Sequence, residues 1–251
     1  MTLETFFRQV PKAAAAFSGG TDSALLLWAA KKYGCDVGAY YVKTPFQPRF
    51  EYEDACRLAR ELDVPMTVVE LDILAVPEAA ANGPQRCYHC KRALFTGLWE
   101  AARRDGYPVL LDGTNASDDA GERPGMRALR ELEIRSPLRE CGLTKADVRR
   151  LSREAGLFTW DKPAYACLAT RIPTGTPIQA RDLERVERAE AALEALGFRD
   201  FRVRLFHGAA RVQVTAAQLP LALERREDLT AALRADFSDI LLDLAPRAPS
   251  T

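Results

Sequence analysis

Short apolar runs alternate with helix-like patterns along the first two thirds of the chain. The predicted strands occupy residues 13–17, 37–42, 66–71 and 108–111. The predicted helices occupy residues 23–32, 52–62, 91–104 and 144–155. Strands and helices in alternation predict a parallel sheet with helices on both faces. Ligands of such sheets bind beyond the carboxyl ends of the strands, so functional residues are expected there.

Residues 157–178 interrupt this pattern with prolines, a glycine and little periodicity. Long irregular segments in compact proteins usually carry function, so we predict a functional loop and a domain boundary here. The remaining predicted elements are a helix at 179–196, strands at 201–206 and 210–214, a helix at 219–235 and a strand at 240–244. The two adjacent strands form a hairpin with a solvated His207 at its tip. The sequence thus predicts an α/β domain at 1–177, a small α+β domain at 178–246 and a tail at 247–251.

Charge and composition narrow the class of protein. Lys plus Arg and Asp plus Glu each number 35, so the net charge is zero. This balance gives no global electrostatic argument for binding nucleic acid or an anionic membrane. No apolar run approaches the roughly 20 residues of a membrane-spanning helix, and the N-terminus lacks an apolar signal core. We expect a cytoplasmic protein whose six cysteines are thiols, metal ligands or catalytic groups.

The strongest motif, Phe-Ser-Gly-Gly-Thr-Asp-Ser at residues 17–23, connects the first predicted strand to the first predicted helix. Gly19 and Gly20 allow a tight turn whose N–H groups, with the helix N-terminus, form an anion site. Ser18 and Ser23 add hydroxyl groups, and Asp22 is expected to hold magnesium or to order the loop. The chain contains neither a Walker A motif nor a G-x-G-x-x-G motif. A plain glycine-rich turn is the alternative.

A second polar segment, residues 112–119, follows the fourth predicted strand and is expected at the same edge of the sheet. Asp112 and Gly113 are its candidates for contact with a nucleotide or magnesium. An Asx-rich turn without a ligand is the alternative.

Three cysteines stand in polar surroundings. Cys87 and Cys90 open a predicted helix within Arg-Cys-Tyr-His-Cys-Lys, and their spacing places both thiols on one helical face. Two thiols do not complete a tetrahedral zinc site. Cys167 lies in the irregular loop between Lys162 and Arg171, which favours a reactive thiol. We expect the other cysteines, Cys35, Cys56 and Cys141, to be packing residues.

Taken together, these segments resemble the LarE-type sulfur transferases of the PP-loop ATP pyrophosphatase superfamily. The shared motifs are the loop at 17–23, Arg-Cys-Tyr-x-Cys-Lys, Asp-Gly-Thr-Asn-Ala-Ser-Asp, Arg-Ser-Pro-Leu at 135–138, Lys-Pro at 162–163 and Cys-Leu-Ala-x-Arg-Ile-Pro at 167–173. The resemblance covers residues 17–214. It implies an adenine nucleotide alpha hydrolase-like domain that binds ATP through Ser18, Gly19, Gly20, Asp22, Ser23, Asp112 and Gly113.

The resemblance also implies a reaction. LarE-type enzymes use ATP and magnesium to adenylate a carboxylate of a pyridinium biscarboxylic acid mononucleotide, releasing pyrophosphate. Sulfur then displaces AMP, giving a thiocarboxylate of the nickel-pincer cofactor of lactate racemase. In one type, a cysteine at the position of Cys167 gives up its sulfur and becomes dehydroalanine. In the other, three cysteines hold a 4Fe-4S cluster carrying a sulfide. The matching Cys87, Cys90 and Cys167 favour the cluster type.

The second domain supplies the remaining candidates. Arg202 and Arg204 match the family's Arg-x-Arg strand and point the same way, so they are expected to bind the substrate phosphate. A solvent-facing pair of charges is the alternative. Arg171 and Glu190 are further candidates, Glu190 for metal or substrate contact, although its helix also carries other glutamates.

Three other functions compete with this one. A PP-loop tRNA thiolase would need an RNA-binding surface, which the neutral charge does not indicate. An amide-forming PP-loop ligase would leave the clustered thiols without a role. An adenine-nucleotide sensor with a structural metal is the candidate outside the enzymes. The resemblance to LarE-type sulfur transferases also implies a homo-oligomer and a sulfur-donor system that recharges a cluster.

Overall fold

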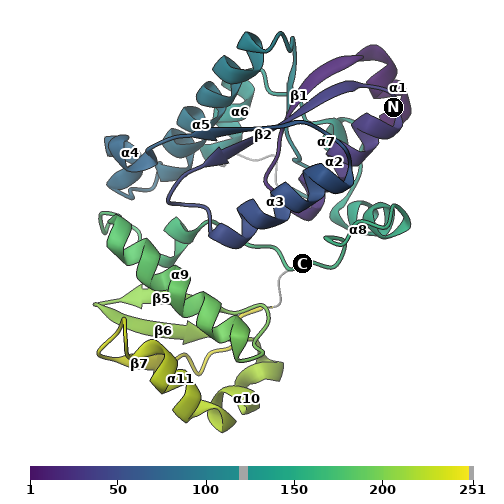
Figure 1. Ribbon diagram of the computed structural model, residues 1–251. Coiled ribbons are helices and arrows are strands. Elements are labelled where there is room, and N and C mark those ends of the chain that lie inside the picture. The colour runs from purple at the N-terminus through teal and green to yellow at the C-terminus, as the bar shows by residue number, and fades with distance from the viewer. Residues whose placement is uncertain (119–123, 249–251) are drawn as a thin grey trace. The chain divides into compact units, whose positions relative to one another are not determined.

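The structure, a computed structural model, describes residues 1–118 and 124–248. The chain forms two compact units (Figure 1). Unit 1 comprises residues 1–79 and 85–162, and unit 2 comprises residues 80–84 and those from 163 onward. Among the described residues, no helix is both long and apolar enough to span a bilayer.

Unit 1 is built on a four-stranded parallel sheet with the order β3-β2-β1-β4. Its strands are β1 (Lys12–Ala16), β2 (Asp36–Lys43), β3 (Met66–Glu70) and β4 (Leu110–Leu111). All four predicted strands are therefore present in the described residues, and the predicted α/β class is confirmed. β4 is short, but Leu111 also bridges Arg135 in parallel and extends this edge of the sheet.

Helices cover both faces of this sheet because successive strand residues point to opposite sides. Ala13 and Ala15 of β1 belong to one apolar cluster, and Ala14 between them belongs to the other. In Figure 1, α2 and α3 lie on one face of the sheet, and α5 and α6 lie on the other. The small alanine side chains of β1 allow both helical layers to pack closely.

The helices of unit 1 include several that the hydrophobic pattern does not predict. The structure contains α1 (Leu3–Gln9), α2 (Thr21–Lys32), α3 (Arg49–Glu61), η1 (Ile73–Ala75), α4 (Pro77–Ala80), α5 (Arg86–Arg104), α6 (Pro124–Glu131), α7 (Pro137–Glu140) and α8 (Lys145–Glu154). Thr144 caps α8 as predicted and forms a capping box with Asp147. The unpredicted helices are short, and tertiary packing holds them, as the full burial of Phe6 in α1 illustrates.

Unit 2 is a small α+β unit with the strand order β5-β6-β7. Its elements are η2 (Leu168–Arg171), α9 (Ala180–Ala195), β5 (Arg202–Phe206), β6 (Ala209–Gln213), η3 (Ala216–Gln218), α10 (Leu219–Glu224), α11 (Arg226–Leu233) and β7 (Ile240–Leu242). β5 and β6 form the predicted antiparallel hairpin, whose tip is exposed His207 with φ 50° and Gly208 with φ 86°. The predicted helix at 219–235 is two helices, because the backbone of Arg225 leaves helical geometry between them.

The boundary between the units lies at Lys162 and Pro163, whereas the sequence pattern places it at residue 177. The cause is a cluster of long-range hydrogen bonds that the local pattern does not encode. The side-chain amide of buried Asn82 donates to the carbonyls of Pro173 at 2.8 Å and Thr176 at 3.0 Å. These bonds hold both the segment 80–84 and the end of the irregular loop within unit 2.

The end of the chain also differs from the predicted tail at 247–251. Arg247 donates its backbone N–H to the carbonyl of Val214 at 3.0 Å and its guanidinium to the carbonyl of Asp200 at 2.8 Å. Residue 247 is thus part of unit 2, and residues 249–251 lie outside the described residues.

Candidate active site

The glycine-rich loop lies between β1 and the N-terminus of α2. Gly19 has φ +72°, a conformation that side chains disfavour. A Cβ atom at Gly19 would lie 2.9 Å from the backbone nitrogen of Ala55 and 2.9 Å from the backbone oxygen of Glu51, both in α3. Glycine is therefore required here both for the turn and for the close packing of α3.

The same loop presents donors at a helix N-terminus. Gly20 is the N-cap of α2, and no side chain caps the helix. The first N–H groups of a helix have no partner within it, and the helix dipole adds positive potential there. The hydroxyl oxygens of Ser18 and Ser23 are 3.1 Å apart, which ties the two ends of the loop together. This arrangement is suited to an anionic group.

The polar segment after β4 packs directly on this helix N-terminus, as its place at the sheet edge predicts. A Cβ atom at Gly113 would lie 2.9 Å from the backbone nitrogen of Ser23. Asn115 donates its side-chain amide to Oδ1 of Asp22 at 3.0 Å. The two predicted loops therefore form one continuous polar surface within unit 1. Asp119, the last residue of the predicted segment, lies outside the described residues.

Asp112 is buried at the end of β4, with 6% of its surface exposed. Ser136 donates its hydroxyl to Oδ1 at 2.5 Å, and Thr114 donates its hydroxyl to Oδ2. Burial raises the pKa of Asp112 above its ordinary value, while the two hydroxyl donors and the nearby charge of Lys91 oppose this rise. The carboxylate of Asp112 therefore holds the second loop in place through Ser136 and Thr114. Contact between Asp112 and a nucleotide stays a prediction.

Lys145, which is not among the residues predicted from the motifs, joins the site from α8. Its ammonium lies 2.5 Å from Oδ2 of Asp22. Both side chains are about a quarter exposed, at 22% for Lys145 and 27% for Asp22. Asp22 therefore orders the loops through Asn115 and Lys145, one of the two roles expected for it.

Lys162, the last residue of unit 1, is held against α3. Its ammonium pairs with the carboxylate of Asp54 and lies 4.9 Å from the ring centre of Phe50. Arg149 donates to the backbone oxygens of Trp160 and Lys162, which fixes the approach to this residue. Lys162 is thus tied to α3, the helix whose backbone packs against Gly19 of the glycine-rich loop.

Cys87 and Cys90 are the second and fifth residues of α5. Cys87 is exposed and Cys90 is half-buried. The guanidinium of Arg86 lies 3.6 Å from the sulfur of Cys87. Cys35, by contrast, is buried, and burial raises the pKa of its thiol to about 11. Cys35 is therefore a packing residue, as predicted. Cys56 and Cys141, also predicted to be packing residues, are half-buried like Cys90 and Cys167, so burial alone does not separate the candidate thiols from the others.

Cys167 precedes η2 in unit 2, in a loop that is fixed through its backbone oxygens. The carbonyl of Cys167 accepts hydrogen bonds from the N–H of Thr170 at 3.0 Å and from its hydroxyl at 2.8 Å. Arg171 donates to the carbonyl of Ala166 at 3.0 Å. The half-buried thiol is therefore held on an ordered turn.

Glu190 on α9 is the centre of a buried network. Its carboxylate accepts hydrogen bonds from the guanidinium of Arg171 at 2.7 and 3.1 Å, from the hydroxyl of Tyr165 at 2.5 Å and from the N–H of Val203 at 2.9 Å. The two side chains of this ion pair are 0% and 7% exposed. Glu190 is therefore engaged by protein donors on both oxygens, and the pair locks the cysteine loop to α9 and β5.

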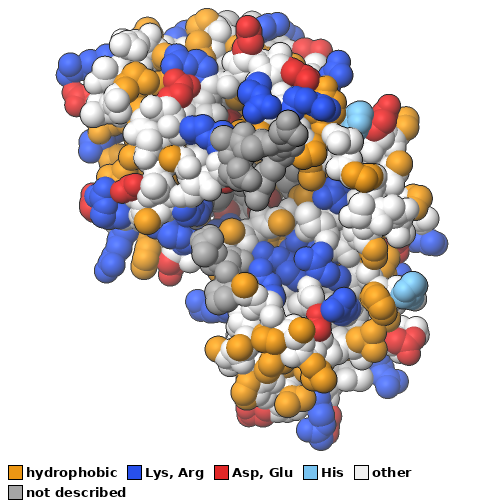
Figure 2. All heavy atoms as spheres, turned by 180° about the vertical axis from the view of Figure 1, so that it is seen from behind, with side chains coloured by type: hydrophobic (Ala, Val, Ile, Leu, Met, Phe, Trp, Pro, Cys, Tyr) orange, Lys and Arg blue, Asp and Glu red, His pale blue; other side chains and the backbone are white. Residues whose placement is uncertain are grey.

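Arg202 and Arg204 of β5 also contact this loop. Arg202 donates to the carbonyl of Ala164 at 2.7 Å, and Arg204 donates to the carbonyl of Thr170 at 2.5 Å. Burial lowers the pKa of both guanidinium groups, that of Arg202 to about 10, and the charge of Arg171 adds to the lowering. Lys and Arg side chains gather on the surface of unit 2 in Figure 2. Unit 2 therefore concentrates positive charge near Cys167, where an anion would be stabilised.

Two relatives extend over most of the chain. An uncharacterized protein of Synechocystis sp. is 37% identical over 218 residues, which cover 86% of this chain and 81% of that protein. The pyridinium-3,5-bisthiocarboxylic acid mononucleotide synthase of Lactiplantibacillus plantarum is 33% identical over 220 residues, which cover 87% of this chain and 80% of that enzyme. The chain belongs to the LarE-type family of sulfur transferases. No protein-family model matches the sequence.

A weaker similarity reaches a second class of PP-loop enzyme. The tRNA-specific 2-thiouridylase MnmA 1 of Clostridium botulinum is 26% identical over 181 residues, which cover 59% of this chain and 51% of that enzyme. This likeness supports the PP-loop domain that the LarE-type family shares with the thiouridylases. The identity and the covered lengths both favour the LarE-type family.

The LarE-type motifs divide between the units. The glycine-rich loop, Asp112, Gly113, Cys87 and Cys90 belong to unit 1, whereas Cys167, Arg171, Glu190, Arg202 and Arg204 belong to unit 2. Sequence reasoning missed Lys145 as a partner of Asp22, and Tyr165 as a partner of Glu190. Lys145 carried a weak signal: a lysine in the first turn of a helix opposes the helix dipole, which suggests a role other than helix stability.

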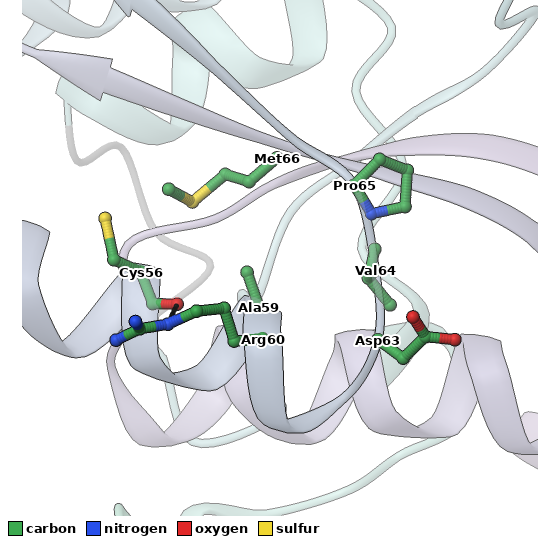
Figure 3. Close-up of a pocket in the computed structure, with 7 residues that line it drawn as sticks. All are labelled: Cys56, Ala59, Arg60, Asp63, Val64, Pro65 and Met66. Atoms are coloured by element: carbon green, nitrogen blue, oxygen red, sulfur yellow. Dashed lines mark hydrogen bonds between the residues drawn. The ribbon is translucent and has the colours of Figure 1, made fainter.

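A shallow hollow of about 730 Å³ lies elsewhere on unit 1. Figure 3 shows its lining of α3 and the start of β3: Cys56, Ala59, Arg60, Asp63, Val64, Pro65 and Met66. Within this lining, Arg60 donates to the carbonyl of Cys56 at 3.2 Å. Met66 begins β3, so the hollow lies at the amino-terminal edge of the sheet. The glycine-rich loop after β1 and the polar segment after β4 lie at the opposite, carboxyl-terminal edge of the sheet.

Proposed function

We propose that this protein activates a carboxylate of a pyridinium mononucleotide with ATP and replaces one of its oxygen atoms by sulfur. The observation that carries this proposal is the 33% identity, over 87% of the chain, to an enzyme named for the bisthiocarboxylic acid mononucleotide that it makes. The glycine-rich helix N-terminus in unit 1 and the ordered cysteine loop in unit 2 support it independently. The product would be a precursor of the nickel-pincer cofactor of lactate racemase.

The first half-reaction is adenylation. A carboxylate oxygen attacks the α-phosphorus of ATP, an oxygen–phosphorus bond forms and pyrophosphate leaves. Ser18, Gly19, Gly20 and Ser23 bind the pyrophosphate half, because N–H groups and hydroxyls converge there. Asp22 would hold magnesium, whose charge would balance that of the phosphates. The result is an acyl carbon with AMP as its leaving group.

The second half-reaction transfers sulfur. A sulfur nucleophile attacks the acyl carbon, a carbon–sulfur bond forms and AMP leaves with the original carboxyl oxygen. Arg202 and Arg204 hold the substrate phosphate, because burial and the neighbouring charge of Arg171 lower the pKa of both guanidinium groups, and a bound anion would offset this repulsion. Arg171 and Glu190 fix the loop of Cys167, since protein donors engage both oxygens of Glu190.

For the sulfur source we propose a 4Fe-4S cluster held by Cys87, Cys90 and Cys167. Three accessible or half-buried thiols are the donor set that such a cluster requires, and an open iron would carry the sulfide. Within the described residues no group of three or more His, Cys, Asp or Glu side chains stands together as a metal site. The cluster therefore rests on thiol chemistry and family resemblance. The alternative source is the Cys167 sulfur itself, with dehydroalanine as the residue left behind.

ATP turnover with defined acceptors tests this function. With magnesium and ATP, we expect AMP and pyrophosphate to form when the pyridinium biscarboxylic acid mononucleotide is added, and not when tRNA is added. AMP formation that requires tRNA would instead favour a tRNA thiolase, the class to which the weaker relatives belong. Iron and acid-labile sulfide contents of protein purified without oxygen then separate the two sulfur sources.

A further inference from the structure

We propose that Lys145 is a phosphate ligand of bound ATP and that it pairs with Asp22 only while the nucleotide is absent. When ATP binds, the ammonium of Lys145 moves from the carboxylate of Asp22 to a phosphate oxygen, and the vacated carboxylate oxygen takes magnesium. This exchange rests on the ATP-dependent function proposed above. It assigns Lys145 to the nucleotide site and orders the arrival of the metal after that of the nucleotide.

The first observation is that both oxygens of Asp22 are engaged. Oδ1 accepts from the amide of Asn115 at 3.0 Å, and Oδ2 accepts from the ammonium of Lys145 at 2.5 Å. A magnesium ion on Oδ2 would stand against an ammonium at hydrogen-bond distance, and two cations repel strongly at that separation. Asp22 therefore becomes a magnesium ligand only after Lys145 leaves it.

The second observation is that the backbone of Lys145 is fixed to the nucleotide loops. Its N–H donates to the hydroxyl of Ser117 at 2.9 Å, and the N–H of Ala116 donates to the carbonyl of Leu143 at 2.7 Å. These bonds tie the start of α8 to the segment after β4. The long side chain is then the mobile part, and it is already directed at the N-terminal turn of α2.

The third observation is that the position of Lys145 is unfavourable for its own helix. It is the first residue of α8, where the helix dipole disfavours a cation. The neighbouring Thr144–Asp147 capping box already satisfies the helix terminus. The ammonium of Lys145 therefore does not stabilise α8, and its role lies in the contact that the side chain makes. The ammonium contacts Asp22, which lies two residues after the Gly20 N-cap, where the triphosphate is expected.

Charge decides the direction of the exchange. A triphosphate carries several negative charges and attracts an ammonium more strongly than one carboxylate does. Magnesium prefers carboxylate and phosphate oxygens. Moving Lys145 to phosphate and magnesium to Asp22 thus replaces one ion pair by two, while Asn115 continues to orient the carboxylate. A fixed ion pair that merely joins α8 to α2 is the alternative, and it would contribute little to stability or binding.

Calorimetric binding of a non-cleavable α,β-methylene analogue of ATP to the full chain tests this exchange. We expect Lys145→Met to weaken binding by about 10- to 100-fold, as loss of a charged hydrogen bond does. Lys145→Arg should retain part of the affinity. Lys31→Met is the matched control, because Lys31 in α2 also pairs with an aspartate, Asp63, at 3.0 Å but lies away from the loops. Circular dichroism verifies that each variant is folded.

Magnesium distinguishes exchange from a fixed pair. In the wild-type protein, magnesium should strengthen binding of the analogue. In Asp22→Asn this strengthening should be lost, while affinity without magnesium stays equal or rises, because Lys145 no longer has a competing carboxylate. Wild-type affinity in Lys145→Met, or a full magnesium effect in Asp22→Asn, would overturn the exchange alone. A wild-type protein that binds no analogue would instead overturn the proposed function.

Discussion

At the scale of single residues, Glu190 and Arg171 form a closely paired set of buried charges. Glu190 and Arg171 are almost fully buried and share two hydrogen bonds, while Tyr165 and Val203 donate to the remaining positions of the carboxylate. Such a pair adds little over an apolar replacement, but removing one partner leaves a buried charge uncompensated. The pair therefore fixes the geometry of the cysteine loop rather than providing most of the stability of unit 2.

Glu190→Gln should lower the free energy of unfolding by about 3 kcal/mol or more, because Arg171 would keep its buried charge without a counter-ion. Urea unfolding measures the change. Glu184→Gln, on the same helix but exposed, is the control and should change stability by less than about 0.5 kcal/mol. Equal losses in the two variants would show that the buried pair has no special role.

Asp112 predicts a pH dependence of stability. Burial raises its pKa in the folded protein above the ordinary value of 3.8, so the folded state binds the proton more tightly than the unfolded state. This contribution is fully present below pH 3.8 and is lost as pH rises through the folded pKa. Relative to Asp112→Asn, the wild-type unfolding free energy should therefore fall with rising pH across that window. A difference that grows with pH would contradict a raised pKa.

At the scale of elements, the glycine-rich turn packs directly against the backbone of α3. Gly19→Ala places a Cβ atom against the backbone of α3, and backbone atoms cannot move aside as a flexible side chain can. We expect a loss of stability beyond the roughly 1 kcal/mol of left-handed strain, together with weaker ATP binding. Thermal unfolding and nucleotide titration measure both effects.

Gly34→Ala provides the matched control for this substitution. Gly34 has a similar φ of +76°, but a Cβ atom there would meet no heavy atom within 4 Å. Gly34→Ala should therefore show the strain alone, with unchanged ATP binding. If the two variants behave alike, close packing of α3 on the loop is not what requires glycine at position 19.

The elements predictable from sequence are those that local periodicity determines. β1, β2, β3 and β4 are predictable as short apolar runs, and the polar loops after β1 and β4 follow from their motifs and their place at strand ends. The pattern did not predict α1, the break at Arg225 or the domain boundary. The boundary depends on contacts between residues far apart in the sequence, such as Asn82 with Pro173. The candidate residues were found through motifs, whereas their partners required the fold.

At the scale of the whole molecule, the groups proposed for adenylation lie in unit 1, whereas those proposed for sulfur transfer come from both units. Unit 1 carries the glycine-rich loop and Asp22, which the proposal assigns to adenylation. Unit 2 carries Cys167 and the arginines of β5, which it assigns to sulfur transfer and substrate binding. Because these groups belong to separately packed units, a substitution in the cysteine loop should leave the nucleotide loops intact.

The most direct test of the account is the mass of the mononucleotide product after reaction with ATP and magnesium, for the wild-type protein and Cys167→Ala. The wild-type protein should convert a carboxylate to a thiocarboxylate and release AMP. Cys167→Ala should still release pyrophosphate but leave the product without sulfur. Sulfur incorporation that persists in Cys167→Ala, or a wild-type product with no sulfur under oxygen-free conditions, would contradict the account.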